Sequence, residues 1–171
     1  MTTERSDALY ASWKQSAEKF DYFILAVLGA LCAYISQSFT PEKIGINPGT
    51  FELLALLILV LSIVFGFKRI ESVNQILILN HQLLHSNEMC GILSEVVEKG
   101  TGINRATGEV YTPEYAMKKI DTLSTKKNFI EPQIAKFQGK ASMYYNLRNG
   151  SMFFGFMVIL FAKLFTAYAV A

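Results

Sequence analysis

One lysine, Lys163, stands within the apolar run FMVILFAKLFTAYAVA. A charged side chain in the hydrocarbon of a bilayer costs about 3 kcal/mol on insertion scales, and it usually faces a bundle interior or water. Helical side chains lean toward the helix N-terminus, so this lysine would have to bend against its own direction to reach the nearer headgroups. We therefore expect Lys163 to face protein or a water-filled path, and snorkelling to the headgroups is the alternative.

Glu52 is the acidic residue best placed to pair with this lysine. It precedes the apolar run 53–67. If the two runs are antiparallel helices with level ends, the backbones of Glu52 and Lys163 differ by only about 5 Å in depth. The pair is one interpretation. The other is that Glu52 is a solvated acid in the first turn of a helix, where the helix dipole favours a negative charge.

Other reactive residue types form only weak patterns. His81 and His85 are four residues apart, a spacing that could bind zinc on a helix, and Cys90 follows. Neither HExxH nor a pair of CxxC motifs accompanies them, so two polar residues at the edge of a helical face are the better interpretation. Nucleotide-binding glycine motifs and GxSxG are absent. We expect no enzyme, no cofactor and no metal site.

Small residues recur in two of the apolar runs at spacings that allow membrane helices to approach closely. They could pack helices within one subunit or between subunits. The positions are Ala26, Gly29, Ala30 and Ala33 in the first run, and Gly155, Ala162 and Thr166 in the last.

Three long runs of almost uncharged residues position these side chains: 22–39, 53–67 and 151–171. A bilayer core about 30 Å thick requires about 20 helical residues, so each run is long enough to span it, the second with some local thinning. The fold class predicted is an all-α membrane protein. We expect an interfacial helix at 1–21, a transmembrane hairpin at 22–67, a helical hairpin at 68–150 and a third span at 151–171.

Basic residues predict the orientation. The segment 68–150 holds 11 of the 16 lysines and arginines, and residues 1–21 hold three more. Positive residues favour the cytoplasmic side, so we expect a cytoplasmic N-terminus and an external C-terminus in a bacterial inner membrane. The formal net charge of +2 is too small to indicate a nucleic-acid partner. Membrane lipids are the expected surroundings.

The segment 68–150 is expected to form a cytoplasmic stalk from inward extensions of spans two and three. An apolar stripe that includes Ile70, Val73, Leu77 and Leu84 is wider than one neighbouring helix requires, which predicts a homo-oligomer. Gly100 and Gly102 should end the first helix of the stalk. Thr112 should cap the second, with Pro113 in its first turn.

The short N-terminal helix, the two-span hairpin and the long helix that continues inward, over about residues 8–98, resemble the SLATT class of bacterial membrane effectors. More loosely, they resemble small membrane proteins that accompany CRISPR and other antiphage systems. The resemblance lies in the architecture, and the third span is additional to it. It implies an oligomeric pore-forming or membrane-perturbing effector with a role in antiphage defence. The alternative is a membrane anchor or adaptor that recruits a cytoplasmic protein.

Overall fold

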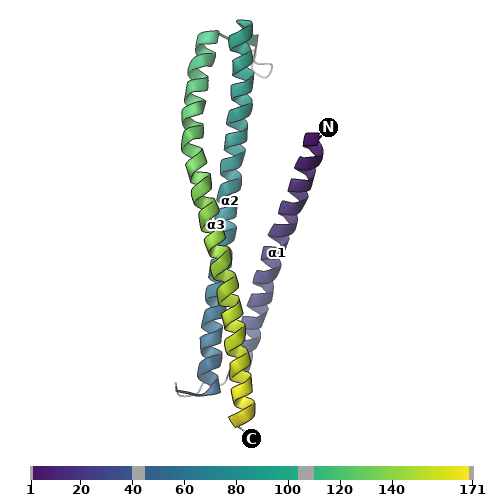
Figure 1. The fold of residues 1–171 in the computed structure, drawn as a ribbon, viewed down its shortest axis with the longest axis vertical. Coiled ribbons are helices and arrows are strands. Elements are labelled where there is room, and N and C mark those ends of the chain that lie inside the picture. Colours follow the sequence, from purple (N-terminus) through teal and green to yellow (C-terminus); the bar gives the residue numbers. More distant parts are fainter. Residues whose placement is uncertain (1, 40–44, 104–109, 170–171) are drawn as a thin grey trace. The chain divides into compact units, whose positions relative to one another are not determined.

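The computed structural model describes residues 2–39, 45–103 and 110–169, and nearly all of them are helical (Figure 1). The three helices are α1 (Thr2–Ser38), α2 (Pro48–Lys99) and α3 (Pro113–Ala169), and two short strands, β1 (Gly102–Ile103) and β2 (Val110–Tyr111), lie between the last two. All three helices contain a window long and apolar enough to cross a membrane. The predicted all-α chain with three candidate spans is therefore confirmed.

The chain divides into two compact units. We call the first, Met1–Glu71 with Ala141–Ala171, the membrane unit, and the second, Ser72–Lys140, the hairpin unit. The boundaries predicted at 67/68 and 150/151 differ from these by several residues. Arg69 and Arg148, just beyond the predicted boundary at 67/68 and just before that at 150/151, both pair with Asp21 of the first helix and so belong to the membrane unit.

The first helix also differs from the prediction. An interfacial helix at 1–21 followed by a separate span requires a change of direction near residue 21, whereas α1 is one continuous helix from Thr2 to Ser38. The chain has no proline or glycine before Gly29 that would interrupt it. The side chains of residues 2–14, which carry most of the predicted interfacial stripe, lie outside the described part of the structure.

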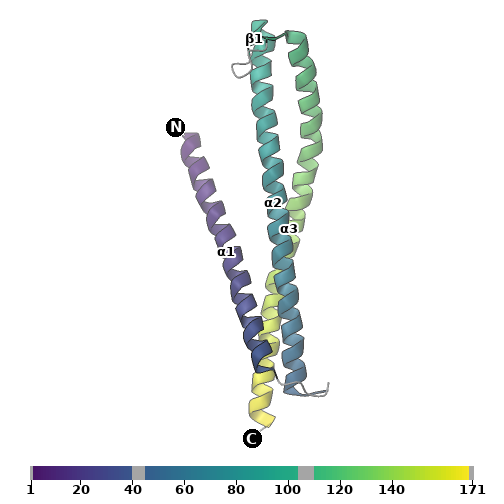
Figure 2. The same cartoon turned by 180° about the vertical axis from the view of Figure 1, so that it is seen from behind.

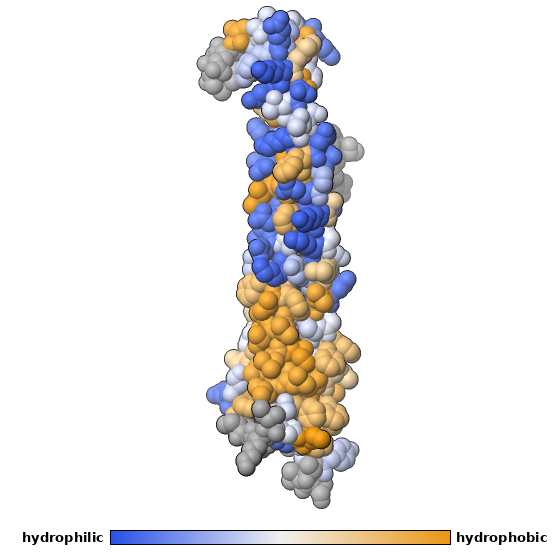
Figure 3. Space-filling model, turned by 90° about the vertical axis from the view of Figure 1, so that its left-hand side faces the viewer, coloured by the Kyte–Doolittle hydropathy of each residue, from blue (hydrophilic) through white to orange (hydrophobic). Residues whose placement is uncertain are grey.

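Each helix of the membrane unit buries one narrow stripe, and Figures 1 and 2 show the three helices side by side there. Buried positions recur at intervals of three, four or seven residues, the spacing that packs helices as knobs into holes. They are Asp21, Leu25, Leu28 and Ile35 on α1, Ala55, Leu59, Ser62 and Gly66 on α2, and Arg148, Gly155 and Ala162 on α3. Large apolar side chains on the other faces remain exposed, and apolar surface covers this unit in the space-filling view (Figure 3).

The hairpin unit has a small core of its own. Leu93 and Val96 of α2 pack against Ala116 of α3, and Ile120 and Leu123 extend the contact. At the tip, β1 pairs antiparallel with β2, with Gly102 opposite Tyr111 and Ile103 opposite Val110. A small hairpin around Thr107 and Gly108 is suggested by the sequence, and these two residues lie outside the described part of the structure.

The helix ends show which residues act as caps. Gly100, with a φ of 80°, ends α2, and its amide donates to Val96 O at 3.0 Å. Thr112 Oγ1 accepts from the amide of Tyr115 at 3.4 Å, as expected for a cap of α3. Thr50, which the sequence also suggests as a cap of α2, does not cap it; Asn47 does. Asn47 Oδ1 accepts from the amide of Thr50 at 2.8 Å, because Pro48 already occupies the first turn.

Candidate functional site: two layers of charge in the membrane unit

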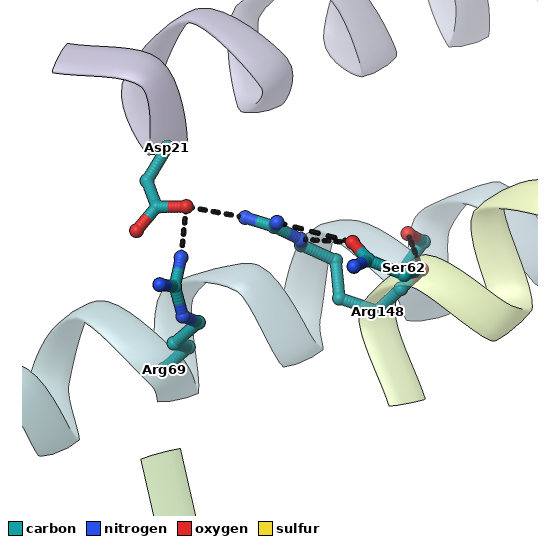
Figure 4. A network of polar contacts seen from close by, with 5 residues as sticks. Asp21, Ser62, Arg69 and Arg148 are labelled. Carbon is teal, nitrogen blue, oxygen red and sulfur yellow. Dashed lines mark hydrogen bonds and ion pairs between the residues drawn. The ribbon is translucent and has the colours of Figure 1, made fainter. Parts of the chain in front are cut away.

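Three charged side chains from three different helices meet at one end of the membrane unit (Figure 4). Asp21 Oδ1 of α1 accepts a hydrogen bond from Arg148 Nη1 of α3 at 2.7 Å and another from Arg69 Nη1 of α2. The side chain of Asp21 is 9% exposed, that of Arg148 is 2% exposed and that of Arg69 is 20% exposed. We call this group the Asp21 layer. It joins all three helices through one carboxylate.

Neighbouring polar groups fix the orientation of Arg148. Its Nε and Nη2 both donate to Asn149 Oδ1 at 3.1 Å, so all three guanidinium nitrogens are engaged. Its backbone carbonyl accepts from Ser62 Oγ of α2 at 2.9 Å. The Tyr145 ring lies beneath both guanidiniums, 4.8 Å from Arg69 Cζ and 5.3 Å from Arg148 Cζ. These contacts restrict the position of the Arg148 side chain.

Gly66 allows this close approach of the helices. A Cβ at Gly66 would collide with the Leu25 side chain and would lie 3.4 Å from Arg148 Cδ. The Asp21 layer was not predicted from the sequence, where the basic residues of the segment 68–150 served only to predict the orientation. The detectable signal is the spacing of Asp21, Leu25 and Leu28, which places an acid on the packed face of the first span.

A second ion pair lies at the other end of the unit. Lys163 Nζ of α3 is 2.5 Å from Glu52 Oε1 of α2. The structure thus contains the Glu52–Lys163 ion pair, which was one of the two interpretations of Glu52 from the sequence. The Glu52 side chain is 13% exposed and that of Lys163 is 58% exposed, so the carboxylate is packed inside while the lysine lies on the surface of the subunit. We call this pair the Lys163 layer.

Aromatic contacts join α2 and α3 at the same end of the unit as the Lys163 layer. Phe51 packs edge-on against Phe161 at 5.2 Å between ring centroids and against Phe165 at 6.2 Å. These contacts hold the start of α2 against the last turns of α3. Glu52 therefore stays beside Lys163 without depending on the ion pair alone.

The two layers bracket an apolar slab. From Glu52 to Arg69 the rise along α2 is about 25 Å, and from Arg148 to Lys163 along α3 it is about 22 Å, at 1.5 Å per residue. A bilayer core is about 30 Å thick. If the Asp21 layer lies at one hydrocarbon boundary, Lys163 lies several ångströms inside the other. At that depth we expect the Lys163 ammonium to need a protein partner or water.

The small residues of the two spans lie in different environments. Gly155 and Ala162 are buried within the subunit, and a Cβ at Gly155 would lie 2.7 Å from Leu59 Cδ2. Thr166 is exposed, and its hydroxyl donates to Ala162 O at 2.9 Å. On α1, Ala26, Ala30 and Ala33 are exposed, and a Cβ at Gly29 would meet nothing within 4 Å. The small face of α1 is therefore directed away from the other two helices.

The remaining predicted residues are not brought together. His81 and His85 are exposed, and no group of three or more metal-binding side chains occurs in the part of the chain that the structure describes. Of the predicted assembly stripe, Ile70, Val73 and Leu77 are half-buried and Leu84 is exposed.

A groove of about 450 Å³ opens between α2 and α3 in the hairpin unit. Val97, Met117 and Ile120 supply apolar lining, and Glu98 and Asp121 place two carboxylates beside it. The groove could not be predicted from the sequence, because its lining comes from two helix segments that are distant in the sequence and meet only in the folded hairpin unit.

Comparison with family models, with curated proteins and with solved structures gave no match. The description of this chain therefore rests on its fold and site. They define an α-helical protein with three candidate membrane spans, in which a layer of ion pairs stands at each end of an apolar slab.

Proposed function

We propose that the protein is an oligomeric, pore-forming protein of a bacterial inner membrane, with Lys163 facing a water-filled path shared between subunits. The observation that carries this proposal is the asymmetry of the Lys163 layer. Glu52 is packed within the subunit, whereas the Lys163 side chain is on the outside. A lysine at this depth needs water or protein on its exposed side, and a path between subunits supplies water.

Conduction requires several copies, because the interior of one membrane unit is filled. Leu59 and Ser62 of α2, Leu28 of α1 and Arg148 of α3 are almost completely inaccessible. The small face of α1 supports assembly, since small residues allow a helix of another subunit to approach closely; its exposed members are Ala26, Ala30 and Ala33. A ring of lysines in such a path would favour anions.

In this proposal the N-terminus and the segment 68–150 are cytoplasmic, the C-terminus is external, and the hairpin unit forms the cytoplasmic stalk. The role of an effector in antiphage defence rests on the architectural resemblance to SLATT-like proteins. The charge distribution along the sequence supports the orientation.

Chloride efflux from proteoliposomes tests the proposal. The wild-type protein should release chloride, and Lys163→Leu should reduce the release severalfold while leaving membrane insertion intact, because leucine inserts more readily than lysine. Lys126→Leu, which removes an exposed lysine of the hairpin unit, is the matched control and should not change the rate. Equal efflux from wild type and Lys163→Leu, or no efflux above that of empty vesicles, contradicts the proposal.

The groove of the hairpin unit favours a second candidate function, a membrane anchor that recruits a cytoplasmic protein. Its apolar lining and its two carboxylates suit a basic amphipathic segment of a partner. Titration of a labelled lysine- and leucine-rich helical peptide onto the reconstituted protein tests it. Binding that is lost in a Glu98→Lys, Asp121→Lys variant, together with absent chloride efflux, selects the anchor over the pore.

A further inference from the structure

The Asp21 layer holds more positive than negative charge. One carboxylate, Asp21, faces two guanidiniums, those of Arg69 and Arg148, and both hydrogen bonds reach the same oxygen, Oδ1. Arg148 is almost entirely enclosed. At the edge of a low-dielectric membrane an uncompensated charge is costly, so a further anion beside this layer would be stabilised.

The charged side chains nearest in sequence do not supply that anion. Lys68 Nζ pairs with Glu71 Oε2 at 2.8 Å, and these two charges offset each other. Glu18 lies one turn before Asp21 on α1, and no ion pair joins it to either arginine among the described residues. On α3 the neighbour of Arg148 is the neutral Asn149.

Arg69 is the member of the layer that an external anion can reach. Its exposed fraction is 20%, compared with 2% for Arg148. One of its nitrogens binds Asp21, and its face lies over the Tyr145 ring. Its other donors have no hydrogen-bond partner in the described part of the chain. A guanidinium fixed in this way presents a planar pair of donors that matches two oxygens of a phosphate group.

We propose that Arg69 binds the phosphate group of an anionic membrane lipid, with the buried Arg148 adding its charge from behind. The position of Arg69 at the end of the apolar part of α2 sets the phosphate at the level of the headgroups, which is where lipid phosphates lie. This lipid site does not depend on whether the protein is a pore or an anchor.

The test measures thermal unfolding of the full chain in nanodiscs of phosphatidylcholine with increasing phosphatidylglycerol. The melting temperature of the wild type should rise with phosphatidylglycerol, and Arg69→Gln should abolish that increment whatever its own starting stability. Lys68→Gln is the matched control. It removes an exposed positive charge next in sequence and should retain most of the increment. Equal increments in wild type and Arg69→Gln overturn the site.

Two further arms distinguish the source of the phosphate and guard against a misfolded variant. Native mass spectrometry should show phosphatidylglycerol retained in preference to phosphatidylcholine, with retention about tenfold weaker in Arg69→Gln, as expected for loss of a charge-assisted contact. Arg69→Lys, which keeps the charge and loses the planar fork, should fall between the two. If inorganic phosphate in phosphatidylcholine nanodiscs raises the melting temperature as much as phosphatidylglycerol does, the lipid assignment is wrong.

Discussion

Asp21 is the residue on which the geometry of the membrane unit depends most. Its carboxylate is the only acidic partner that the described residues offer to Arg69 and Arg148, and these three side chains come from three helices. Buried ion pairs often add little net stability compared with apolar packing, but an incomplete one is costly. The layer therefore fixes the relative register of the three spans, because sliding any helix by one turn would separate the charges.

Replacing Asp21 with Asn should destabilise the protein by about 3–5 kcal/mol, because the buried Arg148 and the half-buried Arg69 lose their common counter-charge. The measurement is unfolding in detergent micelles by titration with a denaturing detergent. Asp121→Asn, at an exposed position of the hairpin unit, is the matched control and should change stability by less than about 0.5 kcal/mol. Similar stabilities for the two variants would show that the Asp21 layer does not hold the helices together.

At the scale of the elements, the sequence predicted the helices well and their contacts only in part. The three apolar runs and the Glu52–Lys163 pair could be derived from helical rise, because both depend on distance along a helix. The Asp21 layer could not, because it depends on which face of each helix is packed. The continuity of α1 agrees with the absence of proline and glycine before Gly29, a sequence signal that the predicted break near residue 21 did not take into account. The small residues of the first span illustrate the difference. Their spacing predicted a face for close helix contact, and the structure leaves Ala26, Ala30 and Ala33 of that face exposed on the single subunit.

Two glycines of α3 test the packing of the membrane unit. Gly155→Ala should destabilise the protein by about 1–3 kcal/mol, because the added Cβ would lie 2.7 Å from Leu59 Cδ2. Gly139→Ala meets nothing within 4 Å and should instead stabilise α3 by about 0.5–1 kcal/mol through its helix propensity. The same denaturing-detergent titration measures both changes. A result with the opposite order would contradict the described packing.

The exposed small face of α1 tests assembly separately from folding. Gly29→Leu should leave the helix content unchanged and should not destabilise a single subunit, because a Cβ there meets nothing within 4 Å and leucine has the higher helix propensity. The same change should dissociate the oligomer, because a bulky side chain keeps another helix at a distance. Mass measurement of the detergent-solubilised protein gives the result. Val27→Leu, at an exposed apolar position of the same helix, is the control and should retain the wild-type mass.

At the scale of the whole molecule, the chain combines an apolar membrane unit with a hairpin unit that has its own core. The described side chains fill the interior of the membrane unit, so the proposed function uses two of its outer surfaces: the small face of α1 and the Lys163 side chain. A function that uses both surfaces requires neighbouring copies. The proposed function therefore includes both oligomerisation and a water-filled path between the subunits.

The reversal potential of the reconstituted protein in a planar bilayer, under a potassium chloride gradient, tests that claim most directly. The account predicts a wild-type potential shifted toward the chloride equilibrium value. Lys163→Glu should shift it toward the potassium value, because the charge facing the path is reversed. Absence of any current from the wild type, or the same reversal potential for wild type and Lys163→Glu, would contradict the account.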